Sequence, residues 1–123
     1  MQNMETIKNR YLQDGLDKRL GGIAANLARI ASFSINPQNW EAVQTMLEET
    51  KFFIEWTAPD APLNVQAFLV EVQIQITLWH RNWPRIYANP EECKKIRQWA
   101  VSVTERIFTV TSGAYSSPSL ESL

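Results

Sequence analysis

The sequence predicts an all-α protein, a four-helix bundle whose short turns are marked by proline. Apolar residues recur at alternating intervals of four and three over most of the 123 residues, which is the spacing of one helix face. Turn signals divide the chain into pieces of helix length, and they lie near residues 15–17, 36–37, 59–62 and 89–90. We therefore expect a single domain over residues 1–111, followed by a flexible, serine-rich tail over residues 112–123.

The first predicted helix follows Gly15. Its apolar face is formed by Leu16, Leu20, Ile23, Leu27 and Ile30. A stripe of small residues, Gly21, Ala25 and Ala28, runs beside that face, although a glycine inside a helix costs about 1 kcal/mol relative to alanine. The stripe indicates either a close approach of two helices, within the bundle or across the two-fold axis of a homodimer, or a break between a short amino-terminal helix and the next one.

The second predicted helix lies between the Asn36-Pro37 signal and Pro59. Its apolar face comprises Trp40, Val43, Leu47, Thr50, Ile54 and Thr57. Phe52 and Trp56 fall outside this face and lie among Glu48 and Glu55. Because a large apolar pair bordered by charges is typical of a surface that binds another protein, we predict that these four residues bind a partner. The alternative is that the helix buries a wider face.

The third segment, residues 63–83, fits two patterns. From Val70 to Leu78 apolar and polar residues alternate, which is typical of a half-buried strand, but the segments that could pair with it also fit a helix. As a helix it has one apolar face with Val65, Leu69, Val72, Ile76, Trp79 and Trp83, and a second stripe with Val70, Ile74 and Leu78. We predict a helix that is apolar on two sides and lies in the middle of the bundle.

The fourth predicted helix begins at residues 89–92, where Asn89 can cap it and Pro90 fits its first turn. Glu91 and Glu92 add negative charge near the positive end of the helix dipole. Its apolar face comprises Ile96, Ala100, Val103, Ile107 and Val110. This helix is expected to complete the core.

Residues 79–87 combine aromatic and cationic side chains in an unusual density. Arginine beside aromatic rings can bind phosphates, flat bases or a carboxylate, so an alternative function is the binding of a small ligand or single-stranded nucleic acid. The residues concerned are Trp79, Arg81, Trp83, Arg85 and Tyr87. In the structural interpretation, which we favour, the two tryptophans close one end of the core and the arginines cover them.

Enzymatic motifs are missing from the sequence. It contains no phosphate-binding glycine loop, and a thiol mechanism would have to pair Cys93 with the single histidine, His80. The glutamates spaced by seven residues in the second helix come without a Glu-x-x-His motif. We therefore expect no catalytic residue, no metal and no cofactor.

The overall composition limits the partners and the compartment. A net charge of −1 argues against nucleic acid, and the apolar runs are far shorter than the roughly 20 residues that a membrane-spanning helix needs. A single cysteine favours a reducing compartment. We expect a soluble, cytoplasmic protein without membrane contact.

Three strings carry a resemblance to a known group of proteins: residues 20–29 (LGGIAANLAR), 52–56 (FFIEW) and 78–83 (LWHRNW). On these strings the chain resembles a small, uncharacterised all-helical protein family of cyanobacteria over about residues 16–111. The resemblance implies a cyanobacterial cytoplasm and no activity. With the residue patterns, it leads us to expect a non-enzymatic adaptor, assembly factor or regulatory subunit that binds another protein and forms a homodimer.

Overall fold

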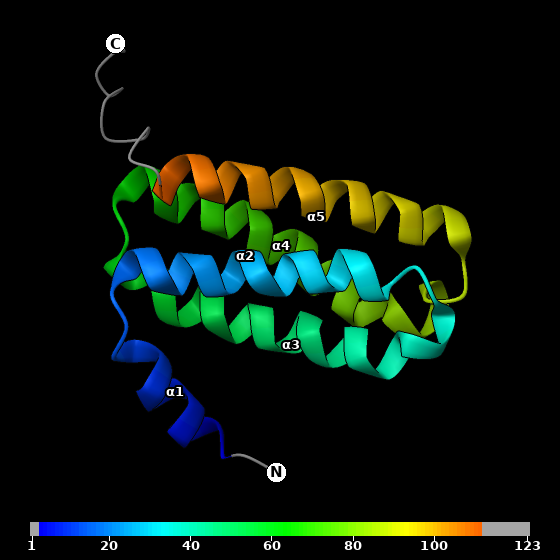
Figure 1. The fold of residues 1–123 in the computed structure, drawn as a ribbon, viewed down its shortest axis with the longest axis horizontal. Coiled ribbons are helices and arrows are strands. Elements are labelled where there is room, and N and C mark those ends of the chain that lie inside the picture. Colours follow the sequence, from blue (N-terminus) through cyan, green and yellow to red (C-terminus); the bar gives the residue numbers. More distant parts are fainter. Residues whose placement is uncertain (1–2, 112–123) are drawn as a thin grey trace.

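The computed structural model describes residues 3–111, and this part of the chain is α-helical with two short 3₁₀ turns (Figure 1). The predicted all-α class is confirmed. The helices are α1 (Met4–Leu12), α2 (Leu16–Phe33), α3 (Trp40–Thr57), α4 (Leu63–Ile86) and α5 (Pro90–Thr111), and the 3₁₀ turns are η1 (Pro37–Asn39) and η2 (Ala58–Asp60). The predicted tail over residues 112–123 lies outside the described residues.

The described residues form five α-helices, so the predicted four-helix bundle is not confirmed. The additional helix is α1. Asn3 caps it, since its side-chain oxygen accepts a hydrogen bond from the amide nitrogen of Glu5 at 2.7 Å. A helix of nine residues is marginal in water by itself, so its stability depends on packing against the rest of the protein.

Asparagine side chains cap the amino ends of the helical segments that follow two of the predicted turns. The side-chain oxygen of Asn89 accepts hydrogen bonds from the amide nitrogens of Glu91 and Glu92 at 3.0 and 3.2 Å. The side-chain oxygen of Asn36 accepts one from the amide nitrogen of Gln38 at 3.0 Å. These bonds satisfy amide groups that have no partner inside their helix, which is why the chain turns at these points.

The four long helices lie side by side, and α1 diverges from them at one end (Figure 1). α2 packs along both α3 and α5, α3 also packs against α4, and α4 packs against α5. α1 packs against α3. Helices that follow one another in the sequence are therefore neighbours in space, and the contact between α2 and α5 brings the first and the last long helix together.

The core between the long helices is formed by the predicted apolar faces, except that Trp40 at the start of α3 is 36% exposed. Its most fully buried large side chains are Leu20, Ile23, Leu27, Ile30, Val43, Leu47, Val65, Leu69, Ile76, Trp83, Ile96 and Ile107. Burial of one such side chain stabilises the folded state by roughly 1.5–3 kcal/mol. The core thus fixes which side of each helix faces outward.

Residues 63–83 form a helix, as predicted, and the alternative of a strand is excluded. The helix continues through Pro84 to Ile86. The expected burial of its second apolar stripe is wrong, because Val70, Ile74 and Leu78 are exposed. α4 packs against α3 and α5 with its other side and leaves this stripe on the outside of the protein.

Candidate protein-interaction surface

Four aromatic side chains meet where α1 packs on α3: Tyr11, Phe52, Phe53 and Trp56. The rings of Tyr11 and Phe53 are stacked, with centroids 4.5 Å apart. The ring of Trp56 lies 5.7 Å from those of Tyr11 and Phe52 and 6.1 Å from that of Phe53. We refer to these four residues as the aromatic cluster.

The hydroxyl group of Tyr11 connects α1 to α2 and α3. It donates a hydrogen bond to the carbonyl oxygen of Arg19 at 2.9 Å and lies 2.7 Å from Oγ1 of Thr57, with which it shares another. The carbonyl oxygen of Phe53 is 3.4 Å away. Burial raises the pKa of Tyr11 to about 12, so the phenol keeps its proton and remains a donor at neutral pH.

Arg19 fixes the end of α3 to the start of α2. Its side chain is almost completely buried. Its Nη1 atom donates to Oδ2 of Asp60 at 2.9 Å and to the carbonyl oxygen of Trp56 at 3.4 Å. The segment that carries Trp56 is therefore held by a charge-assisted hydrogen bond.

The predicted partner-binding residues lie together on α3. Phe52 and Trp56 are half-buried, and Glu48 and Glu55 are exposed. Positions 48, 52 and 55 are separated by four and three residues and share one side of the helix. The structure thus places the apolar pair beside its acidic border, on the side of α3 that faces away from the core.

Tyr11 and Phe53 belong to the aromatic cluster, but the sequence patterns did not predict them as part of the partner-binding surface. Met4, Ile7 and Tyr11 are spaced by three and four residues, which is the spacing of a short amphipathic helix and the signal that could have identified α1. Phe53 directly follows Phe52 and could have been assigned to either side of α3.

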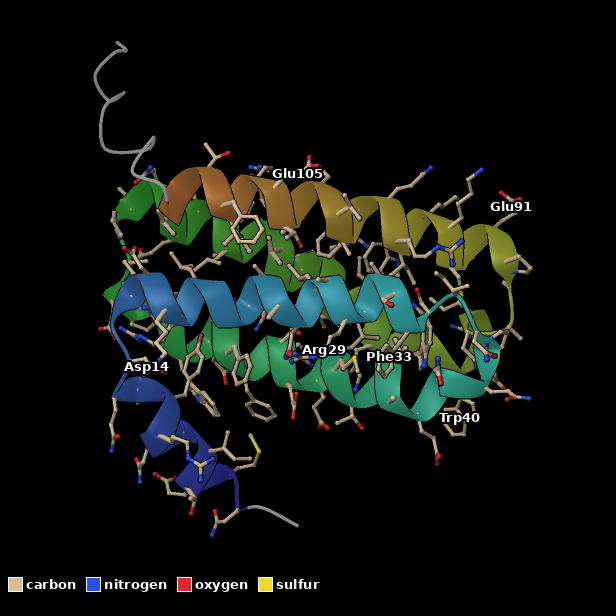
Figure 2. All side chains as sticks on the ribbon, viewed as in Figure 1. Asp14, Arg29, Phe33, Trp40, Glu91 and Glu105 are labelled. Atoms are coloured by element: carbon tan, nitrogen blue, oxygen red, sulfur yellow. The ribbon has the colours of Figure 1, made fainter. Side chains whose placement is uncertain are left out.

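α1 is attached to the bundle at its carboxyl end. None of its nine residues is fully buried, and Met4 and Leu12 are exposed. Asp14, labelled in Figure 2 where α1 and α2 join, forms an ion pair with Lys18 at 3.4 Å. This pair is local to the start of α2 and does not reach α1, so Tyr11 provides the link between α1 and the bundle.

The structure separates the residues of the alternative site, residues 79–87. Trp83 is 1% exposed, and its Nε1 atom donates to the carbonyl oxygen of Trp40 at 2.7 Å. Arg81 and Arg85 are exposed. Trp40, labelled in Figure 2, marks the start of α3, so the ring of Trp83 reaches across the core to the neighbouring helix.

The two other aromatic residues of this segment contact further rings. Trp79 meets Trp99 edge to face, with centroids 4.8 Å apart, and the ring of Tyr87 lies 5.5 Å from that of Trp40. Trp79 and Arg85 border a shallow hollow of about 470 Å³ between α4 and α5. Two of the five predicted residues therefore meet at one depression.

The small residues of α2 lie on its outer side. Ala25 and Ala28 are exposed, and a Cβ atom added to Gly21 would have no atom within 4 Å. A Cβ atom on Gly22 would meet Cε1 of Tyr11 at an ordinary 3.7 Å. No contact between helices in the described part of the chain is therefore close enough to require a glycine at position 21. The alternative of a break at these glycines is wrong, since α2 runs through both.

Cys93 and His80, the two residues that a thiol mechanism would need, both lie in surroundings that favour their neutral forms. Cys93 is 3% exposed, and its Sγ atom lies 3.4 and 3.6 Å from the carbonyl oxygens of Tyr87 and Ile86, to which it can donate. Burial raises the pKa of the Cys93 thiol, while burial, assisted by Lys51, lowers the pKa of His80. Both shifts favour the neutral forms rather than a thiolate and an imidazolium.

Residues 3–111 contain no group of three or more His, Cys, Asp or Glu side chains that could hold a metal ion. Within the same range, every helix is too short or too polar to cross a lipid bilayer. No protein-family model matches the chain, and no curated protein or solved structure is significantly similar to it.

Proposed function

We propose that this protein is a non-enzymatic helical module that binds a partner protein through the outer side of α3. One observation supports this most directly: Phe52 and Trp56 are large, adjacent and only half-buried, although the core side of the same helix is closed around Ile54. Aromatic residues contribute most to binding when a partner completes their burial. In this role the protein acts as an adaptor, assembly factor or regulatory subunit.

The charges around the pair define the chemistry of the partner. Glu48 and Glu55 are exposed and seven residues apart, so they lie on one side of α3 with Phe52 between them. Opposite charges favour a basic partner, and the aromatic pair requires apolar residues from it. The proposed partner segment is an amphipathic helix whose apolar side is flanked by lysine or arginine.

Co-purification from the source organism, followed by titration of the captured protein, tests the proposal. We expect Phe52→Ala with Trp56→Ala to abolish capture, because the double substitution removes the apolar contact, and to retain the helical circular dichroism spectrum. Val101→Ala is the matched control, since Val101 is an exposed apolar residue on α5, and it should retain capture. Glu48→Lys with Glu55→Lys should weaken binding by about tenfold at low salt and by less at high salt.

Two results would contradict this function. Unchanged binding by the Phe52→Ala, Trp56→Ala variant would show that the partner does not bind to this side of α3. Unfolding of that variant, in a range where Val101→Ala is stable, would show that the two rings act as core residues. In that case Glu48→Lys with Glu55→Lys, which leaves the rings in place, decides whether the face binds a partner.

A second candidate is the binding of a small ligand or single-stranded nucleic acid by residues 79–87. The hollow beside Trp79 and Arg85 favours it, whereas the enclosed position of Trp83 leaves one tryptophan fewer for stacking. Titration with nucleotides and oligonucleotides, followed by tryptophan fluorescence at two salt concentrations, distinguishes this candidate. A response that Arg85→Ala removes would support it, and a flat response would reject it.

The architecture, oligomeric state and compartment of the protein follow the same function. We propose that α2 to α5 form a four-helix bundle to which α1 is attached, and that the protein acts in the cytoplasm as a homodimer. The single cysteine supports a reducing compartment, and the stripe of half-buried Gly21 with exposed Ala25 and Ala28 offers one surface for self-association. Membership of the cyanobacterial family that the sequence resembles belongs to the same proposal.

A further inference from the structure

The outer side of α4 carries a continuous apolar ridge. Leu63, Val70, Ile74 and Leu78 are exposed at 81, 53, 57 and 48%, and Ala67 is exposed between them. These positions lie opposite the core side at intervals of four, three, four and four residues, so they form one stripe about 22 Å long. We refer to these five residues as the α4 ridge. Stripes of this spacing are the seams along which helices pair.

Opposite charges flank the two ends of the α4 ridge. Arg81 and Arg85 continue the same side of the helix beyond Leu78, and both are exposed. Asp60 lies ahead of Leu63 at the other end, and its side chain is 56% exposed although it also accepts a hydrogen bond from Arg19. Asp60 belongs to η2, so α4 together with the turn that precedes it is complementary to a second copy in the reverse direction.

We propose that two copies of this chain form a homodimer by packing their α4 ridges antiparallel about a two-fold axis. An axis between Val70 and Glu71, at the centre of the ridge, places Leu63 of one copy level with Leu78 of the other. It also places the small Ala67 level with the large Ile74. The apolar side chains of the two ridges then complement one another in size.

The charges select the antiparallel direction. With the same axis, Arg81 of one copy lies beyond Leu63 of the other, at the end of the ridge where Asp60 precedes α4, so opposite charges meet at each end of the interface. A parallel arrangement would place Arg81 beside Arg81 and Asp60 beside Asp60, and like charges at a helix seam are unfavourable. The same axis brings the two Glu71 carboxylates near one another, but Glu71 lies at the exposed edge of the ridge, where water and salt screen their repulsion.

Hollows on both sides of the ridge provide room for the side chains of a second helix. One hollow, of about 330 Å³, lies between α3 and α4 and is bordered by Val70. The other, of about 470 Å³, lies between α4 and α5 and is bordered by Leu78. When a row of side chains lies between two hollows, the side chains of another helix can pack into the hollows on either side of it. The α4 ridge is more apolar than the small-residue stripe of α2, and α4 is therefore the surface that self-associates in this arrangement.

Sedimentation equilibrium of the full chain between about 1 and 100 µM tests the dimer. We expect twice the 14.2 kDa mass of the chain at the upper end of the range. Ile74→Glu should give a monomer with an unchanged circular dichroism spectrum, and Val70→Lys provides a second variant at another ridge position. Val101→Glu on α5 is the matched control, with similar exposure, and Ala25→Glu tests the competing surface on α2. Both should remain dimeric.

Three results of this experiment would overturn the inference. They are a monomer over the whole concentration range, a dimer that Ile74→Glu and Val70→Lys leave intact, and a dimer that Ala25→Glu dissociates. The dimer should also persist in the Phe52→Ala, Trp56→Ala variant, and Ile74→Glu should retain the captured partner. Failure of self-association and failure of partner binding are thus observed separately.

Disulfide formation tests the direction of packing. A mixture of the Leu63→Cys and Leu78→Cys variants should form a cross-linked dimer that contains one of each, because the two positions lie level in the antiparallel pair. Each variant alone should remain uncrosslinked, and the unaltered chain is the control, since Cys93 is buried. Cross-linking of either variant with itself, and none in the mixture, would reject the antiparallel arrangement. Arg81→Glu with Arg85→Glu should weaken the dimer by about tenfold at low salt.

Discussion

The Nε1 atom of Trp83 donates a hydrogen bond to the carbonyl oxygen of Trp40 at 2.7 Å and so joins the end of α4 to the start of α3. The ring of Tyr87 lies 5.5 Å from that of Trp40 and 6.2 Å from that of Trp83. Three of the aromatic residues around this corner therefore close one end of the core. Two of them, Trp83 and Tyr87, come from residues 79–87, and Trp40 comes from α3.

Trp83→Phe tests the bond across this corner. The substitution retains most of the buried ring but removes the donor, so we expect the free energy of unfolding to fall by about 1–2 kcal/mol. Trp83→Ala removes the ring as well and should cost about 3–5 kcal/mol. Chemical denaturation measures both values. Trp40→Phe is the control, because the acceptor is a backbone atom, and a loss in that variant equal to that of Trp83→Phe would contradict the assignment.

Tyr11→Phe tests the attachment of α1. The variant keeps the ring stacked on Phe53 but loses the hydroxyl group that bonds to Arg19 and Thr57. We expect amide hydrogen exchange within residues 4–12 to become about fivefold faster, because one net hydrogen bond is worth about 1 kcal/mol, while exchange in the core of α3 stays unchanged. Tyr87→Phe should leave α1 unaffected. Equal exchange in the two variants would show that α1 is held by other contacts.

The attachment of α1 should weaken in strong alkali. Burial raises the pKa of folded Tyr11 to about 12, above the ordinary tyrosine value of about 10. A raised pKa means that the stabilisation is fully present below about pH 10 and is lost as the pH rises through about 12. The ultraviolet absorbance of tyrosinate, taken as the difference between the unaltered chain and Tyr11→Phe, measures this titration. A midpoint near 10 would show that Tyr11 is solvated.

Gly21→Ala should stabilise the protein. Gly21 lies inside α2, and a Cβ atom there meets nothing within 4 Å, so the substitution adds helix propensity without a clash. We expect the free energy of unfolding to rise by about 0.5–1 kcal/mol. Gly15→Ala, ahead of the helix, is the comparison. Destabilisation by Gly21→Ala would indicate that another surface approaches α2 closely at this residue.

The thiol of Cys93 should react slowly with a disulfide reagent at mildly alkaline pH. Its sulfur is buried against the carbonyl oxygens at the end of α4, and burial raises its pKa, so both access and thiolate content are low. We expect denaturant to accelerate the reaction by about a hundredfold or more. Absorbance of the released reagent measures the rate, and a fast reaction of the folded protein would show that this corner opens readily.

The core of the long helices could be predicted because their apolar residues follow a helical period. Leu20, Ile23 and Leu27 on α2 and Ile96 and Ala100 on α5 were assigned to the core from spacing alone and are buried. The second stripe of α4 has the same spacing, yet it is exposed. Spacing shows that a stripe is apolar, but only the arrangement of neighbouring helices decides whether it is covered.

The aromatic cluster could be predicted in part for a similar reason. The position of Trp56 on the outer side of α3 follows from its distance to the core residue Ile54 along the same helix. Its partial burial depends on Tyr11, whose hydroxyl reaches Thr57, 46 residues away in sequence. A contact over such a distance leaves no periodic signal in a single chain.

The pairing of α2 with α5 has a consequence for biosynthesis. A chain emerges from the ribosome amino end first, so α2 is complete well before α5. Until Ile96 and Ile107 have been translated, the side of α2 that carries Leu20 and Leu27 has no cover from α5. The nascent chain therefore exposes the apolar face of α2 to chaperones until α5 has been synthesised and covers it.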